Sequence, residues 1–87
     1  MSKADRLLEK LCAKPIPSDY RWADLVTVLQ HLGYELQKGG KSGGSRRKFY
    51  HREKDLLIHL HEPHPVKLVD KGAVKDVAEH LKANGFI

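Results

Sequence analysis

Three short segments in the middle of the chain carry apolar residues at every second position: YELQK (34–38), SRRKFYH (45–51) and DLLIHLH (55–61). Such alternation is typical of β-strands that bury one face and expose the other. The glycine-rich stretch GGKSGG (39–44) and the residues HREK (51–54) fall between the segments, where turns are needed. Because these connections are too short for a crossover helix, we expect one antiparallel sheet of three strands.

Apolar residues at helical spacing flank the predicted strands on both sides. The stripe before the strands is Trp22, Leu25, Val26, Leu29 and Leu32. The stripe after them is Ala73, Val74, Val77, Ala78 and Leu81. Ser18 or Asp19 is expected to cap the first of these helices, and Asp70 the second. Gly33 and Gly85 follow the stripes and supply the left-handed residue at which helices often end.

A further helix is predicted at the N-terminus. Behind Ser2, a candidate cap, the residues at helical spacing are Ala4, Leu7, Leu8 and Leu11. KPIP (14–17) removes backbone donors and ends this helix. We expect residues 1–17 to form a helical extension with a proline linker, joined to one domain over residues 18–87 with a single small core.

The charge balance favours anionic partners. The chain has 16 lysines and arginines against 11 aspartates and glutamates, a formal net charge of +5, which suits nucleic acid or an acidic protein surface. A single cysteine, Cys12, excludes an internal disulfide, and the first residues are charged rather than apolar as in a secretory signal. No apolar run is long enough for a membrane span. We expect a soluble, cytoplasmic protein.

The order helix, helix, three strands, helix predicts an α+β fold in which the two core helices cover one face of the sheet and leave the other open. Leu56, Ile58 and Leu60 share one side of the third strand and are predicted to point at the helices. Phe49 belongs with them. The side chains predicted on the open face are Arg46, Lys48, Tyr50, Leu57, His59 and His61. Two turn lengths preserve this alternation, and they set Arg46 opposite either His61 or His59.

Four stretches carry a family resemblance. They are RWADLVTVLQHLGYEL (21–36), GGSRRKFYH (43–51), HEPHP (61–65) and KGAVKDVAEHLKANGF (71–86). Together and in this order they resemble the HicA toxins, the small ribonucleases of HicA and HicB toxin-antitoxin pairs. The resemblance implies a fold like the double-stranded RNA-binding domain, which agrees with the order of elements above. It also implies cleavage of mRNA without a cofactor, and a protein partner that is a HicB-type antitoxin.

One departure from the family pattern shapes the predicted site. Many HicA toxins begin strand two with Gly-Ser-His and rely on that histidine for RNA cleavage, whereas Gly44 and Ser45 are followed here by Arg46. Arginine stays protonated far above neutral pH, so it is no plausible general base. It can still contact a phosphate or stabilise its developing charge.

Histidines at the end of the third strand are therefore the predicted catalytic groups, because histidine titrates near neutral pH and can act as base or acid without a metal. His61 is the first candidate. His59 or His64 is expected to assist it, and His64 matches a family position by its spacing to Gly72. The predicted RNA and phosphate contacts are Arg46, Arg47, Lys48, Tyr50 and Lys41. The histidines expected in the hairpin or in structural positions are His51, His31 and His80.

Three classes of function fit these residues. The first is an RNA-cleaving toxin, and the second is an RNA-binding module of the same fold that lacks activity because Arg46 replaces the usual histidine. The third is a metal-binding protein, because HLHEPH (59–64) supplies three imidazoles and Glu62. Alternation puts His59 and His61 on one face, but nothing in the sequence fixes a fourth ligand or a second shell.

Overall fold

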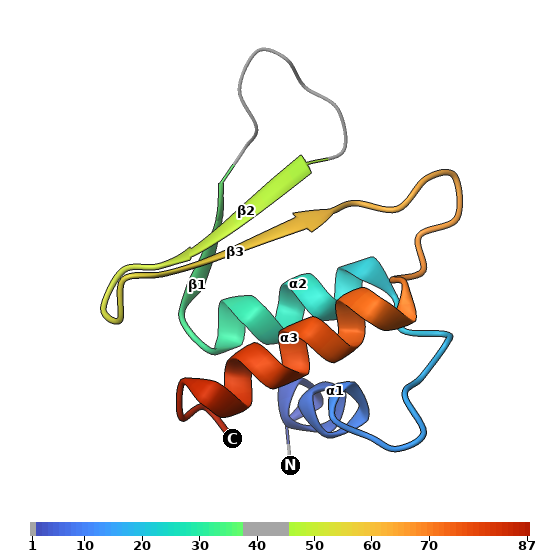
Figure 1. The fold of residues 1–87 in the computed structure, drawn as a ribbon, viewed down its shortest axis with the longest axis horizontal. Helices are drawn as coiled ribbons and strands as arrows, with labels where there is room; N and C mark the ends of the chain where they lie inside the picture. The colour runs from blue at the N-terminus through green and yellow to red at the C-terminus, as the bar shows by residue number, and fades with distance from the viewer. Residues whose placement is uncertain (1, 38–45) are drawn as a thin grey trace.

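The computed structural model describes residues 2–37 and 46–87, and within them the elements follow the predicted order (Figure 1). The helices are α1 (Lys3–Leu11), α2 (Trp22–His31) and α3 (Lys71–Ala83). The strands are β1 (Tyr34–Gln37), β2 (Arg46–His51) and β3 (Leu56–His61). The predicted α+β class is confirmed. None of the helices in the described residues combines the length and the apolar character needed to cross a membrane.

The three strands form one antiparallel sheet in the order β1-β2-β3, so β2 is central and β1 and β3 are the edges. β3 begins at Leu56, one residue later than predicted, because Asp55 has a φ of 52°, a left-handed turn conformation foreign to a strand. The strand ends predicted at residues 38 and 45 lie outside the described residues. Of the two predicted registers, the sheet adopts the one that pairs Arg46 with His61.

One face of the sheet packs against the helices. The buried side chains that the strands contribute to the core are Tyr34, Phe49, Ile58 and Leu60. Those contributed by α2 and α3 are Trp22, Leu25, Val28, Leu29, Val74, Val77 and Leu81. In Figure 1 the sheet lies on one side of α2 and α3. His59 and His61 are exposed on the opposite face, so the predicted assignment of faces is confirmed.

The start of α2 differs from the prediction. Its N-cap is Arg21, which has an extended backbone with a φ of −84° and a ψ of 143°. The Trp22 amide donates a hydrogen bond of 3.0 Å to the Lys67 carbonyl, and Arg21 forms an isolated antiparallel β-bridge with Leu68, which precedes α3. The prediction that Ser18 or Asp19 caps this helix is wrong, because a tertiary pairing keeps the backbone extended as far as Arg21.

α1 packs against α2 and α3 and shares their core. Leu11 is only 2% exposed and belongs to the same buried cluster as the sheet residues. The Tyr20 hydroxyl, also inside this cluster, donates a hydrogen bond of 2.7 Å to the Leu7 carbonyl. The predicted boundary at residue 17 therefore separates two segments that bury surface against each other. That residues 18–87 form a domain by themselves stays a prediction.

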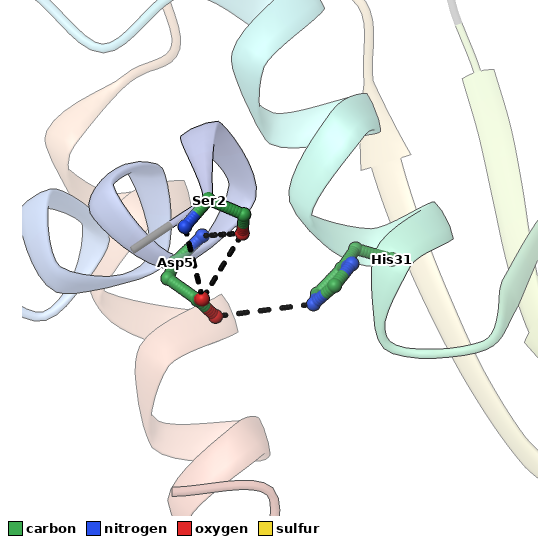
Figure 2. A network of polar contacts seen from close by, with 3 residues as sticks. All are labelled: Ser2, Asp5 and His31. Atoms are coloured by element: carbon green, nitrogen blue, oxygen red, sulfur yellow. Dashed lines mark hydrogen bonds and ion pairs between the residues drawn. The ribbon is translucent and has the colours of Figure 1, made fainter.

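A polar network also joins α1 to α2. Ser2 is the N-cap of α1, as predicted: the Asp5 amide donates to Ser2 Oγ at 3.2 Å, and the Ser2 amide donates to Asp5 Oδ2 at 3.3 Å. Figure 2 shows that the same carboxylate faces His31, whose Nε2 lies 3.9 Å from Asp5 Oδ1. Hydrogen bonds from Ser2 lower the pKa of Asp5, which keeps the carboxylate charged beside the imidazole.

The other helix ends agree with the sequence. Gly33 and Gly85 follow α2 and α3 with φ values of 103° and 79°, in the region that glycine enters more easily than other residues. Asp70 caps α3, since its Oδ2 accepts a hydrogen bond of 2.9 Å from the Gly72 amide. The end of α2 and both ends of α3 therefore lie at the residues that their local sequences predict.

Candidate active site on the open face of the sheet

Four of the predicted site residues meet on the open face of β2 and β3. The register sets Arg46 opposite His61 and Lys48 opposite His59, and all four residues are exposed. Directly opposed residues of an antiparallel pair have Cβ atoms about 5 Å apart, and neighbouring pairs on one face lie about 7 Å apart. We term these four residues the open-face patch. It sets two cations that can bind a phosphate beside two imidazoles that can transfer protons.

A third pair extends the open face toward the hairpin. Tyr50 lies opposite Leu57 of β3 and Glu35 of β1. The Tyr50 hydroxyl donates a hydrogen bond of 3.1 Å to Asp55 Oδ1, and this bond is the main reason that the pKa of Tyr50 is raised. Leu57 is 46% exposed. This end of the face offers a ring and an aliphatic side chain, which suit base stacking and apolar contacts.

Arg47 lies on the other face of β2. Its partner in the register is Leu60, which is buried. The Nε atom of Arg47 lies 3.2 Å from Glu62 Oε1, and Lys67 Nζ lies 2.6 Å from Glu62 Oε2. The hydrogen bond from Lys67, followed by the charges of Lys67 and Arg47, lowers the pKa of Glu62. Arg47 therefore belongs to an ion-pair cluster after β3, and its RNA contact stays a prediction.

A groove runs along β3 beside the open-face patch. β3 lines it from Leu57 to His61, and α3 lines the opposite wall. The residues contributed by α3 and the chain before it are Pro63, Leu68, Val69, Asp70, Gly72, Ala73, Asp76, Val77 and His80. We term this feature the β3–α3 groove. His59 and His61 therefore border both the open face and a hollow at the edge of the sheet.

His64, the third predicted catalytic histidine, is not part of the open-face patch. His64 is exposed in the loop after β3, and it does not line the β3–α3 groove. Its charge contributes to the lowered pKa of Glu62, which associates it with the ion-pair cluster. Lys41 lies outside the described residues. Direct roles for His64 and Lys41 remain predictions.

His51 has a structural role. It is 4% exposed at the end of β2, next to the hairpin in which it was expected. Its Nδ1 accepts a hydrogen bond of 3.1 Å from the Lys54 amide, so the proton of the neutral ring is on Nε2, which donates to the Leu32 carbonyl at 3.0 Å. Both ring nitrogens are thus used in joining the hairpin to the end of α2.

His80 also has a structural contact. Its Nε2 lies 2.7 Å from the Tyr34 hydroxyl, which links α3 to β1. Burial lowers the pKa of His80 and raises the pKa of Tyr34 to about 12, so both side chains are neutral near pH 7. Two of the six histidines, His51 and His80, therefore stabilise the fold, while His59 and His61 face outward.

The metal-binding alternative requires several ligands within reach of one ion. Within residues 2–37 and 46–87, no three histidine, cysteine, aspartate or glutamate side chains are placed to hold one. His59 and His61 share the open face, but Glu62 is engaged by Arg47 and Lys67. The geometry of these residues thus gives the metal-binding alternative no support.

The family model described as "HicA toxin of bacterial toxin-antitoxin" matches residues 22–86, which is most of the chain. The chain belongs to the HicA toxin family. The match covers α2, the sheet and α3, and α1 lies before it. No curated protein and no solved structure matches the chain significantly. A HicA toxin is the toxin component of a toxin-antitoxin system, so an antitoxin is its partner by family.

Two features of the HicA chain are not predicted by its sequence pattern. The pattern indicates Glu62 only as a metal ligand, although Glu62 joins Arg47 and Lys67 in an ion-pair cluster. The short separation of Glu62 and Lys67 in sequence is a weak indication that these two side chains pair. Arg47, in contrast, reaches Glu62 only through strand pairing. No sequence pattern predicts the β3–α3 groove, because the groove depends on where α3 lies relative to the edge of the sheet.

Proposed function

We propose that this HicA toxin is an mRNA interferase that cleaves RNA on the open face of its sheet without a metal, and that a HicB-type antitoxin neutralises it. The observation that carries the proposal is the register that sets Arg46 opposite His61 and Lys48 opposite His59. Family membership supports the toxin role. The formal net charge of +5 supports RNA as the substrate.

In the proposed reaction, one histidine removes the proton from a ribose 2′-hydroxyl, and the 2′-oxygen attacks the adjacent phosphorus. The other histidine protonates the 5′-oxygen as its bond to phosphorus breaks, which leaves a 2′,3′-cyclic phosphate and a 5′-hydroxyl. His61 is assigned the first role and His59 the second, with His64 as an alternative. Arg46 and Lys48 hold the phosphate oxygens and offset their charge as phosphorus becomes pentacoordinate.

The preferred substrate is unpaired RNA. In-line attack requires the 2′-oxygen, the phosphorus and the leaving oxygen to align, and a flexible strand reaches this geometry more easily than an A-form duplex. Tyr50 lies two residues along β2 from Lys48 and on the same face, where its ring can stack on a base. A strand held by Tyr50 at one end and by Lys48 and Arg46 along its phosphates would pass directly over His59 and His61.

The test is a cleavage assay on a defined RNA in the presence of EDTA. His61→Ala should lower the rate by roughly a hundredfold or more, because positioned proton transfer contributes about that much. His59→Ala and His64→Ala should have smaller effects. Arg46→Ala should weaken RNA binding or turnover without moving the pH profile in the histidine range. His31→Ala is the matched control, because His31 is also exposed but lies on α2.

Each result has a defined consequence. Unaltered activity in the triple variant His59→Ala, His61→Ala, His64→Ala would refute the histidine mechanism. Loss of activity only on addition of EDTA would favour metal-dependent chemistry. Induction of the chain in bacteria, with and without its antitoxin, gives the growth phenotype independently of the assay with purified protein.

A second candidate function is an RNA-binding module without activity. Arg46 at the position of the usual family histidine favours it, because arginine binds phosphate but does not act as a general base. This candidate predicts that the unaltered protein shifts the mobility of RNA and yields no cleavage product. Arg46→Ala and Lys48→Ala would then weaken binding, whereas His61→Ala would not.

A further inference from the structure

β3 is an edge strand that lacks the usual protection against pairing with another strand. Natural edges are protected by charged residues, by proline or by bulges. β3 reads LLIHLH, without a lysine, arginine, acid or proline, and its six residues pair with β2 in an unbroken register. The other edge, β1, carries Glu35. Within the described residues, no further strand covers the backbone of β3 on the side away from β2.

The space beside this edge has room for an extended chain. The β3–α3 groove follows β3 from Leu57 to His61 and has a volume of about 850 Å³. Leu57 and Leu68 line it and remain 46% and 40% exposed, which leaves apolar surface for a partner to bury. Ala73 and Val77 form the apolar part of the α3 wall. The outer edge of β3 and apolar side chains thus face the same hollow.

The charges in the groove discriminate between occupants. Asp70 and Asp76 on the α3 side are both exposed, so this wall repels the phosphates of RNA and attracts a basic side chain. A second copy of the chain would bring its own Asp70 and Asp76 against them if β3 paired with β3. The formal net charge of +5 on each copy adds to this repulsion. The groove therefore fits an extended strand of another protein that carries lysine or arginine.

We propose that the antitoxin adds a strand to the free edge of β3, and that a lysine or arginine of this strand pairs with Asp76 across the groove. The inference rests on the proposed function, since it takes the HicB-type antitoxin as the partner. Main-chain hydrogen bonds along β3 supply affinity, and side chains in the groove supply specificity. The added strand lies beside His59 and His61, so it blocks the site from the edge of the sheet while Arg46 and Lys48 stay uncovered.

Charge reversal on α3 tests the pairing. The probe is the purified antitoxin encoded with this chain, and its affinity is measured by calorimetry. Asp76→Lys should weaken binding by about tenfold or more, because it sets two cations opposite each other. Glu79→Lys is the matched control: it is an exposed acid on the same helix, but it lines a separate hollow between α1 and α3. Its affinity should stay within about twofold of the unaltered protein.

A second pair of variants tests the strand edge. Leu57→Lys adds to β3 the kind of charge that protects natural edges and should weaken binding by about tenfold or more. Ile87→Lys is its control, because Ile87 is also 46% exposed but does not line the groove. Hydrogen exchange of the complex should show new protection in β3 and no change in β1. Circular dichroism of each free variant establishes that it is folded.

The outcomes separate this inference from the proposed function. Equal affinities of Asp76→Lys and Glu79→Lys, or unchanged exchange across β3 in a tight complex, would overturn strand addition. Failure of the antitoxin to bind at micromolar concentration would overturn it too. An RNA assay without product would overturn the proposed nuclease, yet the binding and exchange measurements would still decide how the antitoxin docks.

Discussion

Replacing Gly33 with alanine tests the contact between the end of α2 and the β2–β3 hairpin. Gly33 has a φ of 103°, and a Cβ added there would lie 2.7 Å from His51 Nε2 and 3.2 Å from its Cδ2. The same nitrogen donates a hydrogen bond to the Leu32 carbonyl at 3.0 Å. Alanine at residue 33 therefore strains the backbone and pushes the buried imidazole away from its acceptor.

The expected loss follows from these two contributions. Left-handed backbone costs a residue with a Cβ about 1–2 kcal/mol. Displacement of the His51 ring leaves buried polar groups unpaired, at a cost of about 1–3 kcal/mol. Reduced freedom of the unfolded chain offsets about 0.4–1 kcal/mol. The free energy of unfolding should therefore fall by about 3 kcal/mol, which lowers the Tm of a chain this size by roughly 12–24 °C.

Gly85→Ala is the matched control. Gly85 also has a positive φ, 79°, but an added Cβ would meet no heavy atom within 4 Å. Only the backbone contribution applies there, so the loss should be about 1 kcal/mol. Urea unfolding followed by circular dichroism measures both variants. Equal losses for Gly33→Ala and Gly85→Ala would refute the role of His51, and so would a full loss from Gly33→Ala in a His51→Ala background.

Two further predictions concern α1 and His80. Deletion of residues 1–17 should lower the free energy of unfolding by about 3 kcal/mol or more, because it removes the buried Leu11 and the partly buried Leu7 and Leu8 from the core. Urea midpoints of the two chains measure this, and equal midpoints would establish residues 18–87 as an independent domain. For His80, the pKa in the folded protein is below its ordinary value of 6.5 because of burial, so the unfolded chain binds the proton at a higher pH. The contribution of the neutral His80 to the free energy of unfolding should be complete above pH 6.5 and fall as the pH drops toward the lowered pKa. His80→Gln should reduce this pH dependence, which urea titrations at several pH values measure. An unchanged pH dependence in this variant would contradict the prediction.

The sequence alone determined the elements and their faces. Strand alternation depends only on backbone geometry, so it predicted correctly that Ile58 and Leu60 are buried and that His59 and His61 are exposed. Capping by Asp70 and the left-handed end at Gly33 are equally local, and both are confirmed. The motifs of the family also lie in order along the chain, so the residues by themselves indicate the HicA family.

Tertiary structure decided which of these residues meet. Local pattern left two strand registers open, and only the folded sheet pairs Arg46 with His61. The predicted caps of α2 failed because the segment ahead of α3, more than 40 residues away in sequence, holds Arg21 extended. Alternation puts Arg47 on the face opposite to Arg46 and Lys48, but only the folded chain brings Arg47 to Glu62, with which it forms an ion pair.

The position of α3 beside the free edge of β3 is likewise a product of packing. Its apolar stripe predicted that it would cover the core, but the stripe does not say how far from the sheet edge the helix lies. That distance depends on the side chains packed between α3, α2 and the strands, which come from the whole length of the chain. The β3–α3 groove, with Asp76 on one wall and Leu57 on the other, therefore exists only in the folded protein.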